Sequence, residues 1–403
     1  MGMNDTPSGE RTHITFFGCV NAGKSSVVNA FTSQQLSIVS DVRGTTTDPV
    51  KKSMELLPLG PVMITDTPGL DDESALGGER IARALRALDA SDIALLVADI
   101  TAPVNTADRK LIDEFKKRNI PWLLILNKSD LCNDDGFPSA WSEWKDNAIC
   151  ISALKGTNIT ELKERVAGIL KDTANEPKLI SDLITAGDLI VLVTPIDKAA
   201  PKGRLILPQQ QVIRDALDSG AIPVVCRESE LEKALTSLSE KPRMVITDSQ
   251  VFAFVNKAVP EEIPLTSFYI LMARYKGNLK PSVKGAAVLK EIKDHDKILI
   301  AEGCTHHRQC GDIGSVKLPA WIKEYSGAEP EFFFTSGTEF PADLSIYRLI
   351  IHCGGCMLNH SEAVSRYRHA AEQNIPITNY GIAIAAMKGI LHRSLSVFQY
   401  DFE

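Results

Sequence analysis

Apolar residues gather in short unbroken runs along this chain, and the runs alternate with segments whose apolar positions recur at helical spacing. The run THITFFG precedes the helical segment KSSVVNAF, and the same order of strand and helix recurs almost to the C-terminus. Strands that alternate with helices favour a parallel sheet covered by helices. The pattern therefore predicts an α/β protein.

Breaks in this pattern divide the chain into three parts. The first set of elements ends with the helical segment NITELKERVAGILKD, after which NEPK interrupts the pattern. A second set, between residues 180 and about 260, holds the strand-like runs DLIVLVTPID, IPVVCRES and RMVITDS. A chain of 403 residues also exceeds what one hydrophobic core usually serves. We predict three domains, at residues 1–174, 175–264 and 265–403, of which the last two are smaller parallel α/β units.

The turn after the first strand-like run reads GCVNAGKS and fits the pattern G-x-x-x-x-G-K-[ST]. Gly18 and Gly23 would let the backbone curl so that its N–H groups face a β-phosphate. Lys24 would place a positive charge over the β- and γ-phosphate oxygens, and the Ser25 hydroxyl would ligate Mg²⁺. Together with Ser26, these residues predict a nucleotide-binding loop.

Two later segments predict the partners of this loop. VMITDTPG is a buried strand ending at Asp66, which would hold Mg²⁺ through water, while Gly69 would reach the γ-phosphate. WLLILNKSD is a strand that ends in Asn127, Lys128 and Asp130. An Asp carboxylate can accept both N1–H and N2–H of guanine, a pairing that adenine does not offer. The segments therefore predict a site selective for guanine nucleotides.

Two more segments complete this prediction. In ICISALKG, the backbone of Ser152 and Ala153 would contact the base from its other side. DVRGTTTDPV offers Thr45, Thr46 and Thr47, one of which should reach Mg²⁺ when the γ-phosphate is present. We favour Thr46.

These motifs, in this order, resemble those of small Ras-like GTPases. VNAGKSSVVNAF with RGTTTD is similar to the subgroup that contains Era and the tRNA-modification GTPase MnmE. The resemblance implies a P-loop GTPase domain in which Lys24, Thr46 and Gly69 act on the γ-phosphate. It also implies that Asn21 ligates a K⁺ in place of an arginine finger. The residue after DTPG is Leu70 and not a water-orienting Gln, so slow, K⁺-stimulated hydrolysis is expected.

Two strand-like runs in the last third of the chain end in clusters of Cys and His. HDKILIAEG leads into CTHHRQC (Cys304, His306, His307, Cys310) and YRLII leads into HCGGC (His352, Cys353, Cys356). In a parallel sheet both clusters would emerge on one rim, where α/β sheets bind their ligands. Thiolates in this number select Zn²⁺ or an iron–sulfur cluster, and unligated core thiols are the remaining alternative. The wide spacing of Cys304 and Cys310 fits zinc poorly, whereas three Cys with an exchangeable fourth ligand suit a [4Fe–4S] cluster.

Composition and charge narrow the function. The net charge is −7 and no run of five Lys or Arg occurs, which weighs against nucleic acid as a partner. No apolar segment reaches the roughly 18 residues that cross a bilayer, and the N-terminus lacks signal-peptide order. Eight Cys in such a chain indicate metal or redox chemistry. We expect a cytoplasmic protein that binds neither membrane nor nucleic acid.

The K⁺-type GTPase motifs, the small middle domain, CTH at 304–306 and HCGGC at 352–356 together resemble the HydF family of [FeFe]-hydrogenase maturation GTPases. The resemblance implies a [4Fe–4S] cluster on Cys304, Cys353 and Cys356, with a fourth ligand that is labile or a nearby His, such as His306 or His352. It implies a transient di-iron precursor, made by two radical-SAM maturases and handed to the apo-hydrogenase, with GTP hydrolysis gating partner exchange. It also implies a homodimer joined through the middle domain.

Three other cysteines receive separate interpretations. Cys19 stands in the P-loop where this family commonly has a basic residue, and we interpret it as neutral for nucleotide binding. Cys226 lies in an apolar strand and is expected to be a buried core thiol. Cys310 is not part of the family pattern, so it either competes as the fourth cluster ligand or is merely adjacent.

Two other functions stay open at this point. One is an RNA-modification or ribosome-assembly GTPase with a structural zinc, which the acidic charge balance disfavours. The other is a redox sensor in which Cys353 and Cys356 form a disulfide that alters GTPase activity.

Overall fold

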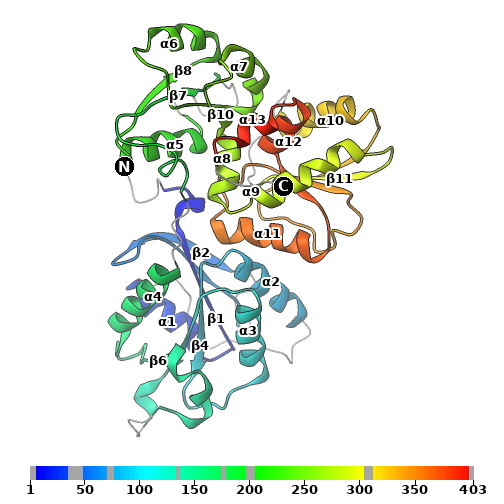
Figure 1. Ribbon diagram of the computed structural model, residues 1–403. Helices are drawn as coiled ribbons and strands as arrows, with labels where there is room; N and C mark the ends of the chain where they lie inside the picture. Colours follow the sequence, from blue (N-terminus) through cyan, green and yellow to red (C-terminus); the bar gives the residue numbers. More distant parts are fainter. Residues whose placement is uncertain are drawn as a thin grey trace. The chain divides into compact units, whose positions relative to one another are not determined.

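The computed structural model describes residues 6–34, 49–69, 77–132, 137–173, 178–196, 205–303 and 312–398, and it is an α/β protein as predicted (Figure 1). The chain forms two compact units. Unit 1 comprises Met1–Asn175 with Asn359–Glu362, and unit 2 comprises Glu176–Leu358 with Ala363–Glu403.

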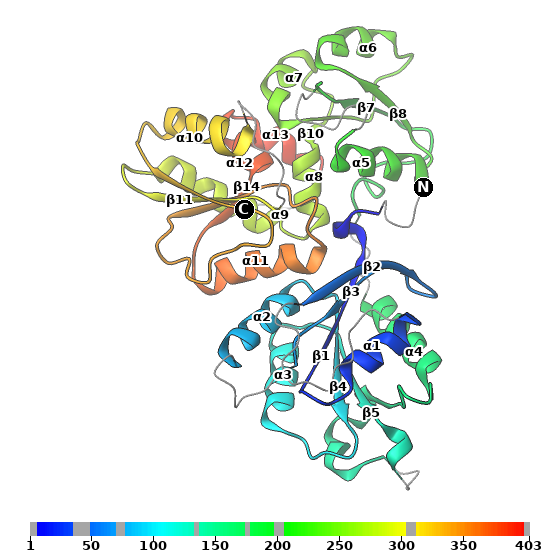
Figure 2. The ribbon, with the colours of Figure 1, turned by 180° about the vertical axis from the view of Figure 1, so that it is seen from behind.

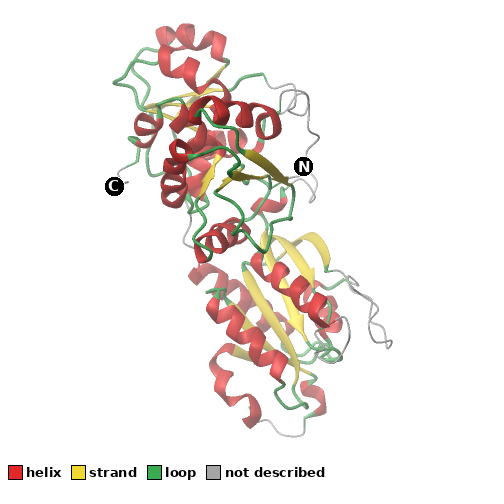
Figure 3. Cartoon of the chain, turned by 90° about the vertical axis from the view of Figure 1, so that its right-hand side faces the viewer, coloured by secondary structure: helices red, strands yellow, loops and turns green. Residues whose placement is uncertain are grey.

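Unit 1 contains a six-stranded sheet in the order β2-β3-β1-β4-β5-β6, in which β2 is antiparallel to β3 and the other pairs are parallel. Its strands are β1 (Thr12–Gly18), β2 (Val50–Leu56), β3 (Gly60–Asp66), β4 (Ile93–Asp99), β5 (Trp122–Asn127) and β6 (Ala148–Cys150). Its helices are α1 (Lys24–Thr32), α2 (Gly77–Asp89), α3 (Thr106–Lys117) and α4 (Ile159–Thr173). Figure 3 shows this sheet between two layers of helices.

The buried strand β1 explains how the helices cover both faces of this sheet. Successive side chains of a strand point to opposite faces, so Phe16 and Phe17 enter different cores. Phe16 packs against Phe31 of α1 with ring centroids 5.5 Å apart, and Phe17 packs against Phe115 of α3 at 5.4 Å. Helices α1 and α4 therefore lie on one face, and α2 and α3 lie on the other (Figure 2).

Unit 2 contains two four-stranded parallel sheets, in the orders β10-β9-β7-β8 and β12-β11-β13-β14. The first comprises β7 (Leu189–Val193), β8 (Ile222–Cys226), β9 (Met244–Thr247) and β10 (Leu265–Ser267), and the second comprises β11 (Lys297–Ala301), β12 (Glu331–Thr335), β13 (Leu349–His352) and β14 (Ile377–Asn379). The helices are α5 (Leu207–Asp218), α6 (Leu231–Ser237), α7 (Phe252–Ala258), α8 (Phe268–Tyr275), α9 (Leu279–Ala286), α10 (Leu318–Ser326), α11 (His360–Glu372), α12 (Tyr380–Met387) and α13 (Leu391–Leu395).

One hydrophobic core serves both sheets of unit 2. It includes Val191 and Ile246 of the first sheet, Ile300 and Ile351 of the second, and Leu271 of α8. The alternation predicted between residues 180 and 260 is confirmed. The predicted boundary after residue 264 needs a correction, because it would separate β10 from β9, with which it pairs in parallel. The other boundaries stay predictions.

The Cys226 prediction also needs a correction. β8 is the edge strand of its sheet, so Cys226 at its end is only partly buried. By contrast, the predicted rim of the second sheet is confirmed. β11 and β13 are parallel neighbours with Ala301 opposite His352, so the two strands end at the same edge of the sheet, where the Gly303 N–H reaches Cys353 Sγ.

Candidate functional site

The predicted nucleotide-binding loop connects β1 to α1. Gly18 and Gly23 have φ angles of +152° and +82°, which L side chains rarely adopt. A Cβ at Gly18 would lie 2.3 Å from the Val97 carbonyl oxygen, and one at Gly23 would lie 2.4 Å from Nδ2 of Asn127. The local backbone therefore requires glycine at both positions of the motif.

The residues predicted to hold Mg²⁺ and the γ-phosphate lie together. The Lys24 ammonium bonds to one carboxylate oxygen of Asp66, and Ser25 Oγ lies 3.4 Å from the other. Lys24 and Asp66 are 9% and 8% exposed, so this ion pair is buried. Gly69 lies against the P-loop, because a Cβ there would come within 2.9 Å of Val20. Ser26, also predicted, follows in the first turn of α1.

The residues predicted to bind guanine are also brought together. Asn127 donates from Nδ2 to the Ala22 carbonyl at 3.1 Å and accepts at Oδ1 from the Ala153 N–H at 3.1 Å. Ser152 is fully buried and donates to Asp130 at 2.6 Å. This bond holds the pKa of Asp130 below its ordinary value. Asp130 is therefore an ionised acceptor, as recognition of the guanine N–H groups requires.

Lys128 contacts Asp99, a residue of the site that was not predicted from the sequence. Its Nζ donates to the Asn21 carbonyl at 2.9 Å and to Asp99 at 2.6 Å, and so ties the NKSD segment to the P-loop. Burial opposes ionisation of Asp99, but hydrogen bonds from Lys128 and Thr101 outweigh it and lower the Asp99 pKa. The signal was present in the sequence, since Asp99 ends the apolar run IALLVAD.

Cys19 belongs to a second contact that the sequence did not reveal. Its Sγ lies 3.1 Å from Nδ2 of Asn105, which donates to it, and 3.5 Å from the carboxyl group of Asp108. Asp108 lies in the first turn of α3 and is 3% exposed. Burial raises the pKa of Asp108 to about 6, although the bonds to Cys19 and Asn105 work against the rise. The thiol thus connects the P-loop to α3.

Several predicted residues lie outside the described part of the chain. They are Thr45, Thr46, Thr47, Leu70, Cys304, His306, His307 and Cys310. Within the described residues, no group of three or more His, Cys, Asp or Glu is arranged to hold a metal.

The HCGGC segment forms the second candidate site. Cys353 Sγ accepts hydrogen bonds from the N–H groups of Gly303 at 3.0 Å and Gly355 at 3.3 Å. Hydrogen bonds to sulfur are among the means by which proteins tune iron–sulfur ligands. Gly303, the residue that precedes Cys304 in the sequence, is thereby bonded to the HCGGC turn. Cys353 and Cys356 are free thiols in this structure.

The two glycines of HCGGC have separate structural reasons. A Cβ at Gly354 would lie 2.2 Å from the ring of Tyr269, so only glycine fits against this ring. Gly355 has a φ of +64°, in the left-handed region, and this turn directs its N–H to Cys353 Sγ. The motif is therefore a tight turn built around one sulfur atom.

Burial keeps the thiols of Cys353 and Cys356 protonated when no cation stabilises their thiolate forms. It raises the pKa of Cys353, against the two N–H bonds, and raises that of Cys356 to about 11. Metal binding must therefore displace protons from this site. A metal ion or cluster suits this donor set, because its positive charge stabilises the thiolate forms that burial disfavours.

Three charged side chains are buried beside these thiols. Lys276 is 3% exposed and donates from Nζ to the Leu358 carbonyl at 2.8 Å. Arg366 is 4% exposed and donates to the Gly337 carbonyl at 2.7 Å. Glu302 is 3% exposed and accepts from the Tyr380 hydroxyl at 3.2 Å. No sequence pattern distinguishes these three residues, because each lies at an ordinary helical or strand-end position.

His352 is engaged through both ring nitrogens. Nδ1 lies 2.8 Å from the Cys353 carbonyl oxygen, and Nε2 lies 3.1 Å from Nη1 of Arg366. Burial, with the nearby Arg366 charge, lowers the pKa of His352 to about 3, so its ring is neutral. These bonds leave no ring nitrogen of His352 directed at a metal.

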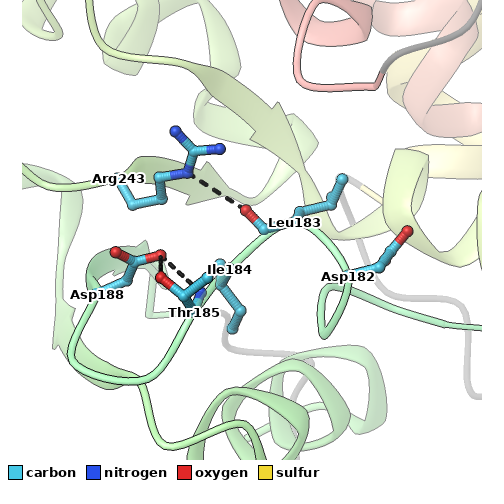
Figure 4. A pocket seen from close by; sticks show the side chains of 6 residues that line it. All are labelled: Asp182, Leu183, Ile184, Thr185, Asp188 and Arg243. Atoms are coloured by element: carbon cyan, nitrogen blue, oxygen red, sulfur yellow. Dashed lines mark hydrogen bonds between the residues drawn. The ribbon is translucent and has the colours of Figure 1, made fainter.

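An open pocket of about 330 Å³ lies elsewhere in unit 2 (Figure 4). Asp182, Thr185, Asp188 and Arg243 contribute to its lining. Thr185 donates to Asp188 from its N–H at 2.7 Å, and Arg243 Nε donates to the Leu183 carbonyl at 3.3 Å. None of the predicted site residues lines this pocket.

Among the helices in the described ranges, none has the length and apolarity that a membrane crossing requires.

Three known protein families match successive parts of the chain. Residues 13–128 match the family described as 50S ribosome-binding GTPase. Residues 179–277 match the hydrogen maturase F dimerization domain, and residues 280–397 match the hydrogen maturase F tetramerization domain. The two hydrogen maturase F matches together span more than half of the chain.

Individual relatives resemble the GTPase part. GTPase Der of Wolinella succinogenes is 34% identical over 181 residues, which are 42% of this chain and 38% of Der. The tRNA modification GTPase MnmE of Streptococcus agalactiae serotype III is 32% identical over 166 residues, 41% of this chain and 35% of MnmE. This chain thus spans well under half the length of either relative. A point variant of Aquifex aeolicus Era bound to GDP and aluminium fluoride aligns with a TM-score of 0.36 and 20% identity, covering 53% of this chain and 91% of Era.

The matched regions agree with the two sites described above. The P-loop, Asp66 and Asn127 fall within the GTPase match, and HCGGC falls within the tetramerization-domain match. The chain carries a GTPase domain and belongs to the hydrogen maturase F (HydF) family.

Proposed function

We propose that this member of the family is a GTP-hydrolysing scaffold that holds a [4Fe–4S] cluster on Cys304, Cys353 and Cys356. The observation that supports it most is the 3.0 Å hydrogen bond from the Gly303 N–H to Cys353 Sγ. It brings the residue before Cys304 against the HCGGC turn, so two segments nearly fifty residues apart share one location. The donor set is rich in sulfur, which suits iron–sulfur chemistry.

The fourth cluster position falls to His306, Cys310 or an exchangeable ligand. His352 is the least suited candidate, because its ring nitrogens bond to Arg366 and to the Cys353 carbonyl. When bound, the cluster would supply an iron with an open position for the di-iron precursor. The chain's own contribution is to hold the thiolates, with the Gly303 and Gly355 N–H groups bonded to Cys353.

In the GTPase domain, each group has a distinct task. The P-loop backbone and Lys24 hold the β- and γ-phosphates, Ser25 ligates Mg²⁺, and Asp66 holds the ion through water. Asp130 selects guanine. For these tasks the Lys24 ammonium must leave Asp66, its bonding partner in this structure, as the phosphates and metal enter.

Asn21 would ligate a K⁺ that stimulates hydrolysis, and Thr46 would complete the Mg²⁺ site. The rate of GTP hydrolysis should then be higher in KCl than in NaCl of equal ionic strength. An Asn21→Ala variant should lose this difference while still binding GDP. Equal rates of the wild type in both salts would refute the K⁺ role.

The partners follow from the same proposal. Two radical-SAM maturases would load the scaffold, the apo-hydrogenase would receive the di-iron unit, and GTP hydrolysis would gate the exchange.

We place the dimer contact on β8, an edge strand on which Ile222 and Val225 are 53% and 45% exposed. Exposed aliphatic residues on a sheet edge favour association.

Anaerobic purification tests the central proposal. The wild type should contain about four iron and four acid-labile sulfide per chain, with a reduced-state electron paramagnetic resonance signal. Cys304→Ala and Cys353→Ala should lose both, whereas Cys226→Ala should retain them as the matched control. Stoichiometric zinc in place of iron, or iron that survives in Cys304→Ala, would overturn the cluster assignment and leave the GTPase domain unaffected.

A further inference from the structure

Lys276 is a buried lysine that bonds to the chain just after HCGGC. Its side chain is 3% exposed, and its Nζ donates to the Leu358 carbonyl at 2.8 Å. The Leu358 N–H donates in turn to the Gly355 carbonyl at 3.0 Å, which closes the backbone around Cys356. Burial of an ammonium group is costly unless negative groups compensate its charge. The position of Lys276 is therefore an unusual one for a lysine.

Helix α8 places this lysine and also contacts the HCGGC turn a second time. Lys276 follows the last residue of α8, and its N–H donates to the Met272 carbonyl at 2.9 Å. Near the start of the helix, the ring of Tyr269 lies where a Cβ at Gly354 would come within 2.2 Å of it. Because α8 contacts the turn through two side chains, packing fixes where the ammonium group lies relative to the turn.

The charge of Lys276 reaches the thiols of this turn. Burial has the largest effect on the pKa of Cys356 and raises it, whereas the Lys276 charge lowers it. Burial also has the largest effect on the pKa of Cys353, which it raises. There the Arg366 charge works against burial, and the Glu302 carboxyl works with it. A buried cation therefore acts on each of the two thiols.

Buried positive charge has a definite consequence for the cluster proposed at this site. Three thiolates outweigh the positive charge of an oxidised [4Fe–4S] core, and one-electron reduction makes the occupied site still more negative. Net charge is one of the factors that set the reduction potential of such a cluster. Electrostatic interactions are strong where water is excluded, so a fixed cation stabilises the reduced form more than the oxidised form. An ammonium group beside the thiolates should raise the potential.

We propose that Lys276 is a positioning residue of the cluster site, whose charge raises the reduction potential and whose hydrogen bond to Leu358 holds the turn. This role rests on the proposed cluster and concerns a residue outside the set of ligands. The two contributions are separable, because a neutral donor can also bond to the Leu358 carbonyl, whereas only a cation stabilises the added electron.

Redox titration of the anaerobically purified full chain, followed by electron paramagnetic resonance, tests the role of the charge. Lys276→Gln keeps a donor, and Lys276→Met keeps an apolar side chain of similar length. Both lose the charge, so the one-electron equilibrium should shift about tenfold toward the oxidised cluster, a fall of about 59 mV in midpoint potential. Lys276→Arg keeps the charge and should stay near the wild-type potential. Lys388→Met, the same change at an exposed position in unit 2, is the matched control and should leave the potential unchanged.

The possible outcomes distinguish a failure of this role from a failure of the cluster assignment. A wild type that lacks iron and sulfide would overturn the cluster, and the role of Lys276 with it. A wild type that holds the cluster, together with unchanged potentials in Lys276→Gln and Lys276→Met, would overturn the role of the charge alone. Where Lys276→Met fails to fold or to hold iron, the other two variants decide. Equal potentials in Lys276→Gln and Lys276→Arg would show that the lysine acts only through packing.

Discussion

Arg366 donates a hydrogen bond from Nη1 to Nε2 of His352 across 3.1 Å. Because a guanidinium group can only donate, this bond makes Nε2 the acceptor and places the ring proton on Nδ1. Nδ1 then donates to the Cys353 carbonyl at 2.8 Å. The imidazole therefore supports the turn that carries the thiols, and its lone pair is used within the protein.

This arrangement predicts that His352→Gln retains a full complement of iron and sulfide. A Gln side chain can accept from Arg366 and donate to the Cys353 carbonyl, so the turn is preserved. His352→Ala removes the acceptor of Arg366 Nη1 and the donor to the Cys353 carbonyl, and should destabilise unit 2 by about 2 kcal/mol. Iron analysis, electron paramagnetic resonance and thermal unfolding of both variants check this. A changed resonance signal in His352→Gln at full iron content would instead indicate that His352 is a ligand.

A second prediction concerns guanine selection. Asp130→Asn replaces an ionised acceptor by an amide that cannot accept both guanine N–H groups. Affinity for GTP should fall by roughly 100-fold or more, and affinity for XTP should rise, because the amide can donate to the xanthine O2. Competition binding with labelled nucleotides measures both effects. The exposed Lys117→Ala is the control, and unchanged GTP affinity in Asp130→Asn would contradict the assigned base contact.

The GTPase site was predictable because its chemistry is local. The glycines, Lys24 and Ser25 lie in one turn, and Asp66 and Asn127 each end an apolar run, so topology alone brings them to one edge. The rim shared by β11 and β13 was predictable for the same reason. Cys226 was misjudged because an apolar run does not reveal whether its strand is central or at an edge. Lys276, Glu302 and Arg366 were missed because their burial depends on packing between segments far apart in sequence.

The buried Asp108 predicts a pH dependence of the stability of unit 1. Its pKa rises from 3.8 to about 6 on folding, because burial disfavours the carboxylate. The native state thus holds a proton that the unfolded chain releases, and stability falls as pH rises from about 4 to about 6. The full shift corresponds to about 3 kcal/mol.

Asp108→Asn removes this titration and keeps an acceptor for Cys19. The variant should be more stable than the wild type at pH 8 and lose most of that advantage by pH 4. Urea unfolding followed by tryptophan fluorescence measures the difference, since Trp122, Trp141 and Trp144 lie in unit 1. Parallel stability curves for the two proteins across this range would contradict the prediction.

Arg393 of α13 predicts a stabilising link within unit 2. Its guanidinium donates to Asn256 at the end of α7 and to the carbonyls of Val259 and Ile263, which precede β10. Arg393→Met leaves these acceptors without their donor and should cost about 2–3 kcal/mol of unfolding free energy. Arg393→Lys keeps the charge but not the planar donor geometry, so its loss should be intermediate. Equal stability of all three proteins in chemical denaturation would refute this role.

The hydrophobic core that joins the two sheets of unit 2 bears on how the molecule melts. Side chains from β7, β9, β11 and β13 belong to one packed interior, so neither sheet can lose its order without exposing the interior of the other. Calorimetry should accordingly resolve two endotherms, one for each compact unit, although three family regions match the chain. A fragment cut between residues 277 and 280 would expose half of this interior and aggregate.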